Sequence, residues 1–443
     1  MDTNLTVDSS PSKEFFIDMI TKDVTVESCI LDLIDNSIDA HKKGKIGIKS
    51  EISINFSLDK DYFQIADNCG GMSKAIAQTK AFRFGNTETR FANSLGMYGI
   101  GMKRSIFKIG ENFYVESKTN TEAFKVYMDR EEWLKLSEWK FHLDDCQIST
   151  EPGVNIHISK LSDSLKAYLK WGKNLANLKT KIASSYKDLI NDEVTIRVNG
   201  ERVIYTEESL FESDIVHSYV RSIKLPNVSI KIIAGISTAS PKEAGWNIIC
   251  NGRTVIDKDK TELTGWESNY TLDEYGNVDG MLNESSKSIP AFHNDFARFR
   301  GYVYIEAEDA NELPLNTTKD SIDRQHPVYE LIYTEMVDIM KKMLPQIRKL
   351  QEIARECKNA GTIPPTESLS AISVESLFQE TKRGFSMQLD SYKPVAKMKS
   401  ITMYIDERDV AKWKQYFEAT TNKELGEKMY KFILDRVDLN EQF

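Results

Sequence analysis

The chain contains the stretch Glu27-Ser-Cys-Ile-Leu-Asp-Leu-Ile-Asp-Asn-Ser-Ile-Asp-Ala40, in which acidic and amide side chains recur between apolar ones. Apolar residues at helical spacing, with Thr25 as a suitable N-cap and Gly44 as a suitable end, predict a helix between these two positions. Asp32 and Asn36 are four residues apart, so they share one face of that helix. This oxygen-rich face suits Mg²⁺, which takes hard ligands and keeps several of its waters.

Two glycine-containing motifs follow. The stretch Asp67-Asn-Cys-Gly-Gly-Met72 ends a predicted strand at 62–66, and Gly71 lets the backbone approach other groups closely. The stretch Gly96-Met-Tyr-Gly-Ile-Gly101 places backbone N–H groups before a predicted helix N-terminus, an arrangement that binds anions such as phosphate. It is not a Walker loop, because Met102 stands where that loop has its lysine. A Rossmann motif is excluded because the glycine order differs and no βαβ unit opens the chain.

Together, the three motifs resemble the nucleotide site of the GHKL ATPases, the superfamily of gyrase, the ninety-kilodalton heat-shock chaperone, histidine kinases, MutL and MORC proteins. The resemblance implies an α+β protein that begins with a Bergerat-type α/β sandwich and hydrolyses ATP with Mg²⁺. Most relatives carry a glutamate four residues before the asparagine that binds magnesium, and it orients the attacking water. Here that position is Asp32. Either Asp32 is the base in a tighter site, or hydrolysis is slow and the protein is mainly a binding switch; Glu27 lies off the Asn36 face and is a poor substitute.

The resemblance also assigns the remaining site residues. Asn36 would coordinate the magnesium, Asp67 would accept a hydrogen bond from the adenine amino group, and Met72 would pack beside the base. Lys103 would add a point charge for the triphosphate. A fourth family motif is weaker, because Val154 replaces its usual threonine. The other candidates for nucleotide contact are Asp39, Gly71, Gly96, Gly99, Ile100, Gly101 and Met102, with Asn86 and Thr87 in the glycine lid.

Resemblance continues beyond these motifs. The stretches Val198-Asn-Gly-Glu-Arg-Val203, Ile249-Cys-Asn-Gly-Arg253 and Pro314-Leu-Asn-Thr-Thr-Lys319 look like the transducer domain of MORC-like and MutL-like proteins. In that domain a loop lysine contacts the γ-phosphate, and Lys319 is the candidate for this catalytic role. A lysine suits the task because its flexible stem delivers a compact charge. The alternative is a solvated loop lysine.

The predicted organisation has five parts. They are a GHKL ATP-binding domain (1–160), a transducer-like domain (161–326), a helical segment (327–360) that Pro345 should kink or interrupt, a linker (361–397) and a C-terminal unit (398–443). A strand pattern at 400–406 precedes two predicted helices, the second opened by a capping box from Thr421 to Glu424. This order resembles a ribbon-helix-helix module, which would dimerise, bind DNA or pack on the helical segment.

Composition and net charge exclude several classes of protein. The net charge of −9 over 443 residues excludes a basic nucleic-acid coat, so contact with DNA would need a local patch. Five dispersed cysteines without a C-x-x-C pair support neither a zinc ribbon nor a disulfide framework. The chain starts without a signal-peptide pattern and has no apolar run long enough for a membrane span, so we expect a cytoplasmic protein without membrane contact.

The function that we predict is an ATP-gated dimeric clamp or switch acting on DNA, in repair, silencing or bacterial antiviral defence. The expected partners are a second copy of the chain, DNA and an operon-encoded protein. One alternative is a chaperone-like ATPase with protein clients. Another is a non-hydrolysing ATP-binding regulator, which the aspartate at position 32 keeps open. We do not expect a histidine kinase, because only about 25 residues precede the ATP motifs. We do not expect a topoisomerase either, because the chain has no room for a cleavage domain.

Overall fold

The structure is a computed structural model. The residues it describes are 10–44, 49–85, 93–96, 99–148, 151–190, 193–267, 271–272, 278–279, 289–316, 318–389, 395–396 and 403–436. They form two compact units, and the second comprises Lys358–Ile363 together with the described part of residues 394–443. Within the described residues, no helix is both long and apolar enough to cross a membrane.

An eight-stranded sheet builds the first domain, in the order β5-β4-β3-β6-β2-β1-β7-β8. Neighbouring strands are antiparallel, except that β1 runs parallel to β7. The strands are β1 (Ser50–Ser57), β2 (Tyr62–Asp67), β3 (Gly110–Lys118), β4 (Ala123–Met128), β5 (His142–Asp145), β6 (Gly153–Leu161), β7 (Val194–Val198) and β8 (Glu201–Arg202).

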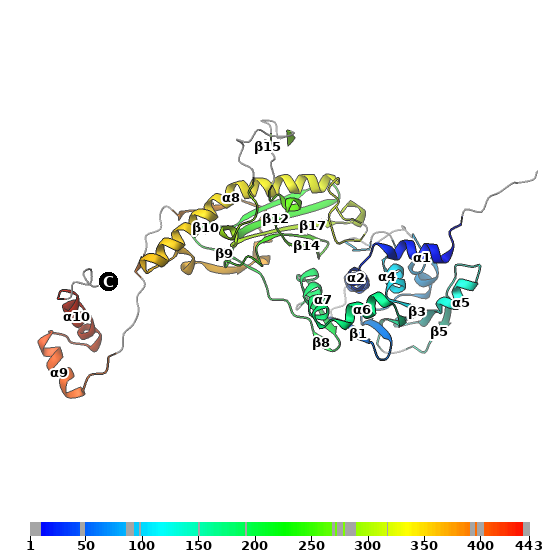
Figure 1. The fold of residues 1–443 in the computed structure, drawn as a ribbon, viewed down its shortest axis with the longest axis horizontal. Helices are drawn as coiled ribbons and strands as arrows, with labels where there is room; N and C mark the ends of the chain where they lie inside the picture. Colours follow the sequence, from blue (N-terminus) through cyan, green and yellow to red (C-terminus); the bar gives the residue numbers. More distant parts are fainter. Residues whose placement is uncertain are drawn as a thin grey trace, which may run out of the picture. The chain divides into compact units, whose positions relative to one another are not determined.

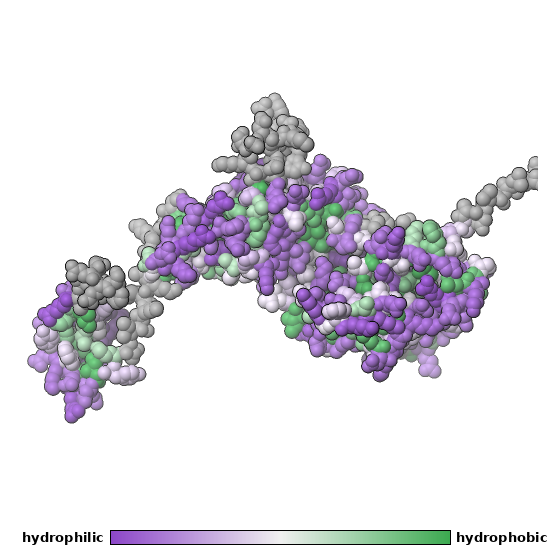
Figure 2. Space-filling model, viewed as in Figure 1, coloured by the Kyte–Doolittle hydropathy of each residue, from purple (hydrophilic) through white to green (hydrophobic). Residues whose placement is uncertain are grey.

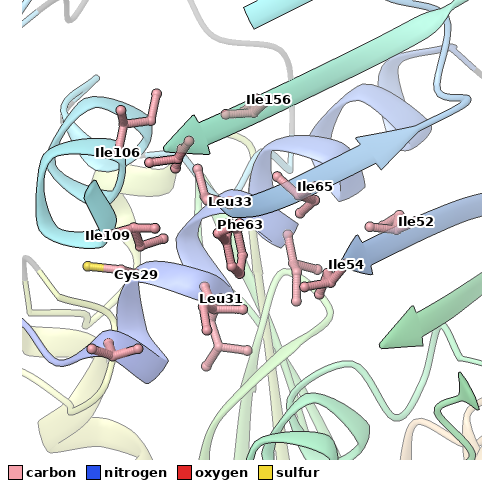
Figure 3. Close-up of a cluster of buried hydrophobic side chains, with 14 of the residues drawn as sticks. Cys29, Leu31, Leu33, Ile52, Ile54, Phe63, Ile65, Ile106, Ile109 and Ile156 are labelled. Atoms are coloured by element: carbon pink, nitrogen blue, oxygen red, sulfur yellow. The ribbon is translucent and has the colours of Figure 1, made fainter. Parts of the chain in front are cut away.

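Helices pack on one face of this sheet and enclose its core. The helices of the domain are α1 (Lys13–Lys22), α2 (Val26–Gly44), α3 (Lys74–Ile76), the π-helical turn η1 (Ala77–Ala81), α4 (Gly101–Ile109), α5 (Arg130–Lys135), α6 (Asp163–Lys170) and α7 (Gly172–Ser185). Alternate residues of the strands point inward, among them Ile52, Ile54, Phe63 and Ile65, and meet Leu33 of α2 in one buried cluster (Figure 3).

The first sheet and its core continue beyond residue 160, where the sequence placed a domain boundary. Strands β7 and β8 complete the sheet, and the core extends through Tyr186 of the segment after α7 to Val203. The reason is the parallel pairing of β1 with β7, which joins residues about 140 positions apart. A parallel neighbour needs a long crossover, here α6 and α7, and this helical stretch had been assigned to the second domain.

A six-stranded sheet forms the second domain, in the order β14-β13-β17-β12-β11-β20. Its strands are β11 (Tyr219–Lys224), β12 (Val228–Ile236), β13 (Gly245–Cys250), β14 (Arg253–Asp259), β17 (Phe299–Ala307) and β20 (Lys382–Arg383), and a short pair, β15 (Thr271–Leu272) and β16 (Val278–Asp279), lies outside it. Helix α8 (Pro327–Ala360) lies along this sheet and shares its core (Figure 1).

The structure of residues 327–397 differs from the sequence prediction in two ways. Helix α8 continues through Pro345, although a proline removes one helical hydrogen bond; its buried neighbours Leu344 and Ile347 hold it against the sheet. The predicted linker is mostly structured. Strand β19 (Ser370–Ser373) pairs with β9 (Ser209–Glu212), and β21 (Ser386–Met387) pairs with β10 (Val216–His217). These edge strands, with β20, return the chain to the second domain.

The C-terminal unit contains a short strand pair and two helices. The pair is β18 (Thr362–Ile363) with β22 (Val395–Ala396), and the helices are α9 (Glu407–Tyr416) and α10 (Asn422–Leu434). The helices agree with the sequence pattern, and Thr421 Oγ1 accepts from Glu424 N at 3.1 Å, as a capping residue does. The predicted ribbon is not formed at residues 403–406, which belong to no strand, and 400–402 lie outside the described residues.

Candidate functional site

One cavity of about 880 Å³ brings most of the predicted site residues together. Its walls come from α2, from the turn after β2, from the segment leading into α4 and from Lys319 of the second domain. The predicted residues that line it are Asp32, Asn36, Asp67, Gly71, Met72, Gly96, Gly99, Ile100, Gly101, Met102, Lys103 and Lys319. Asn86 and Thr87 lie outside the described residues.

Helix α2 presents Asp32 and Asn36 to the cavity. Thr25 Oγ1 accepts from Ser28 N at 3.0 Å, which caps the helix, and the opposite face is buried against the sheet. Asn36 Nδ2 donates to the carbonyl of Asp32 at 2.7 Å, so the amide is anchored while its side chain stays exposed to the cavity. An amide oxygen with this exposure is a suitable ligand for a cation that keeps most of its waters.

Asp67 lines the cavity and is anchored by three donors. Its Oδ2 accepts from the Ser37 hydroxyl at 2.7 Å, and its Oδ1 accepts from Cys69 N at 2.9 Å and Val154 N at 3.3 Å. Burial raises the pKa of Asp67, and these hydrogen bonds oppose the rise. Sequence reasoning missed Ser37, although its place one residue after Asn36 puts it on the cavity side of α2.

The turn after β2 depends on glycine at one position above all. Gly70 and Gly71 have φ values of 94° and 72°, so the left-handed positions fall on glycines and Cys69 is not strained. A Cβ on Gly71 would collide with the carbonyl oxygen of Lys118 and lie 2.7 Å from its carbonyl carbon. The chain therefore passes β3 at backbone contact, and this close approach places Met72 in the cavity wall.

Helix α4 points its N-terminus into the cavity. Gly99 is left-handed at φ 63°, and Gly101 begins the helix with its backbone close to Asp32, since a Cβ there would lie 3.5 Å from the Asp32 carboxylate. The free N–H groups of the first turn and the helix dipole attract negative charge. This end of the cavity suits phosphate.

Asp39 does not contact the cavity and instead holds the segment that leads to α4. Its Oδ1 accepts from Leu95 N at 2.7 Å and its Oδ2 accepts from Gly96 N at 3.0 Å. Burial raises its pKa to about 6, while the hydrogen bond from Leu95 opposes the rise. Both carboxylate oxygens are thus engaged by backbone, which corrects the expectation of direct nucleotide contact.

Lys103 lines the cavity but directs its ammonium to backbone carbonyls. Its Nζ donates to Ala81 O at 2.8 Å and to Arg83 O at 2.9 Å, and the residue is only 4% exposed. Burial lowers its pKa to about 8. The ammonium that was expected to bind the triphosphate therefore holds the end of η1 and the residues that follow it.

We expect Lys103→Met to lower the free energy of unfolding by about 1–3 kcal/mol, because two carbonyls lose their donor. If the cavity binds the nucleotide that the motifs predict, its preference for ATP over ADP should stay unchanged, because two backbone carbonyls already occupy the Lys103 ammonium. Denaturant unfolding and calorimetric titration measure the two quantities, with the exposed Lys140→Met as the control. A lost preference at unchanged stability would assign Lys103 to the phosphates after all.

A buried ion pair engages Asp32, the predicted catalytic base. Arg104 donates to Asp32 Oδ2 through Nε at 2.9 Å and Nη2 at 2.6 Å, and both side chains are almost fully buried. The second oxygen, Oδ1, lies 3.6 Å from Lys319 Nζ and 3.9 Å from Arg253 Nη1, and no described group donates a hydrogen bond to it. This oxygen is buried and is the one whose hydrogen-bonding capacity is unused among the described groups. No sequence signal separated Arg104 from other basic residues.

Asp35 was also missed, and it connects the two domains. The carboxylate is 2% exposed; its Oδ2 accepts from Lys319 Nζ at 2.8 Å and from Arg253, and its Oδ1 accepts from the Tyr186 hydroxyl at 2.7 Å. Burial alone would raise the pKa of Asp35, and the charges of Arg253 and Lys319 bring it below its ordinary value. The sequence signal that could have identified Asp35 was its position directly before Asn36 on α2.

A tight turn presents Lys319 to this carboxylate. Leu315 and Ile322 form a β-bridge, and Asn316 Nδ2 donates to Asp320 Oδ1 at 2.7 Å across the turn. Lys319 adopts φ 53°, a left-handed conformation that is costly for a residue with a Cβ. The lysine is 7% exposed and lines the cavity, so the structure excludes the alternative of a solvated loop lysine.

Residues 24–154 match the family model described as "Histidine kinase-, DNA gyrase B-, and HSP90-like ATPase". This match supports placing the domain in the GHKL superfamily. It covers α2, the turn after β2, the start of α4 and most of the first sheet, which are the parts that form the cavity. A comparison with curated proteins found no match to the chain.

Proposed function

We propose that this protein binds MgATP in the cavity between α2 and α4 and hydrolyses it with Asp32 as the base. The supporting observation is the convergence of five groups on one cavity: Asp67, Asn36, Asp32, the N-terminus of α4 and Lys319. The first domain's match to ATPases of the GHKL type points to the same ligand.

The residues present fit a magnesium-bound triphosphate. Asn36 would hold the ion together with phosphate oxygens and water, because no group of three or more histidine, cysteine or carboxylate side chains in the described residues could hold a metal. When bound, the ion neutralises charge that develops on the phosphates. Asp67 would accept from the adenine amino group, and the N-terminus of α4 would bind the phosphates.

In the proposed reaction, Asp32 Oδ1 accepts the proton of the attacking water. Arg104 holds the other oxygen and so fixes the direction of the carboxylate. The Lys319 ammonium balances the charge that develops at the γ-phosphate. Because Lys319 belongs to the second domain, the presence of the γ-phosphate would be communicated from one domain to the other.

We extend this proposal to an ATP-gated dimeric clamp or switch of the MORC-like type that acts on DNA, in repair, silencing or antiviral defence. The resemblance of the stretches 249–253 and 314–319 of the second domain to transducer domains supports this extension, whereas the third stretch, 198–203, belongs to the first sheet. Residues 403–436 carry seven acidic and seven basic side chains, so this unit lacks the excess of positive charge that DNA binding favours. Its exposed apolar side chains include Met403, Ile433 and Leu434. Figure 2 shows hydrophobic residues on the visible face of this unit, which favours pairing with a second copy.

A second candidate is a non-hydrolysing ATP-binding regulator. The observation that favours it is the ion pair of Arg104 with Asp32, because two hydrogen bonds from Arg104 already occupy one oxygen of the carboxylate that would activate the water. A chaperone-like ATPase with protein clients remains the third alternative, and only its response to partners distinguishes it.

The test is MgATP hydrolysis over a range of protein concentrations, with and without DNA or an unfolded client protein. We expect specific activity to rise with concentration and with DNA. Stimulation by the client alone would support the chaperone, and bound ATP without turnover would support the regulator. Absence of ATP binding would overturn the proposal.

A further inference from the structure

The buried groups beside the cavity carry more positive than negative charge. Three cations, Arg104, Arg253 and Lys319, surround two carboxylates, Asp32 and Asp35, and all five side chains are 7% exposed or less. With the usual charges of these groups, the cluster has a net charge of +1. A buried charge without a counterion is costly, so the cluster favours an anion in the adjoining cavity.

The three cations differ in how firmly they are held. Arg104 makes two hydrogen bonds to one oxygen of Asp32, and Arg253 is paired with Asp35 and does not line the cavity. Lys319 lines the cavity and has one hydrogen bond to Asp35, at 2.8 Å. An ammonium on a flexible stem can exchange partners with little movement, unlike the rigid guanidinium. Lys319 is therefore the cation that an anion in the cavity can attract.

We propose that Asp35 is a positioning residue that competes with the γ-phosphate of ATP for the Lys319 ammonium, and so sets how strongly the site prefers ATP over ADP. The inference rests on the proposed function, because it assumes that the cavity binds the nucleotide. ATP draws Lys319 from Asp35, and ADP, without a γ-phosphate, leaves the contact in place. The cost of breaking the contact is subtracted from the affinity for ATP alone.

The sharpest variant keeps the charge of the cluster constant. Asp35→Asn combined with Arg253→Met removes one charge of each sign, so the net charge stays at +1 while Lys319 loses its competing partner. The dissociation constants of ADP and of a non-hydrolysable ATP analogue, both with Mg²⁺, are measured by calorimetry. We expect the preference for the ATP analogue to rise at least about fivefold over wild type.

Two further variants are matched controls. Adding Lys319→Met to the pair should abolish the gain, because no ammonium remains to be released. The single variant Asp35→Asn keeps all three cations and the shape of the side chain, and it should also raise the preference, because a neutral amide holds the Lys319 ammonium less firmly than the carboxylate does. This variant tests the inference even if the paired variant fails to fold, which circular dichroism reveals.

The results separate this inference from the proposed function. Loss of nucleotide binding in the wild-type protein would overturn both. Binding in the wild type with an unchanged or lowered preference in the paired variant would overturn the role of Asp35 alone. A gain that persists with Lys319→Met would also overturn it, and so would a folded Asp35→Asn variant with the wild-type preference.

Discussion

Asp32→Asn is expected to lower the turnover of MgATP by about 10²–10⁴-fold, the range that a general base contributes. The amide cannot accept the proton of the attacking water, whereas the Asp32 carboxylate keeps one oxygen, Oδ1, that accepts no hydrogen bond from the described groups. MgATP should still bind, because the adenine end and the N-terminus of α4 are unchanged. Steady-state hydrolysis and calorimetric binding measure the two effects separately.

Glu27→Gln is the matched control for this substitution. Glu27 belongs to the same helix, and its Oε1 accepts from the Tyr168 hydroxyl at 2.7 Å outside the cavity. Its loss should leave turnover unchanged. Because Asp32→Asn also deprives Arg104 of its charged partner, we expect a stability loss of about 3 kcal/mol, which denaturant unfolding measures. Turnover retained in Asp32→Asn, or lost in Glu27→Gln, would remove Asp32 from the base position.

Gly71→Ala is expected to abolish measurable MgATP binding and to lower the free energy of unfolding by about 3 kcal/mol or more. The new Cβ would collide with the Lys118 carbonyl, and backbone cannot rotate away as a side chain can. The turn after β2 would have to shift, which displaces Met72 and the groups around Asp67 in the cavity wall. Calorimetric titration and denaturant unfolding check both effects.

Gly85→Ala is the control that separates the steric collision at Gly71 from the general preference of positive φ for glycine. Gly85 has φ 70°, close to that of Gly71, but a Cβ there would meet nothing within 4 Å. Only the left-handed conformation is penalised, by about 1 kcal/mol. Equal losses of stability in the two variants would show that the close approach to β3 does not matter.

The sequence by itself predicted the local elements of the site, because their signals are short-range. Helical spacing and the Thr25 cap placed α2, and the glycines of the Asp67 motif placed the turn after β2. In each case the residues that determine the element lie within about twenty consecutive positions, so the local sequence was sufficient to predict it.

The tertiary structure alone decided which charges act and where the domains end. The parallel pairing of β1 with β7 extended the first sheet beyond residue 160. The Lys103 ammonium, which was expected to bind phosphate, instead donates to backbone carbonyls in a buried site. Arg104 and Arg253 donate to the buried carboxylates of α2. Partners of this kind are tens to hundreds of residues apart in the chain. Their choice depends on desolvation and distance, which a linear pattern does not contain.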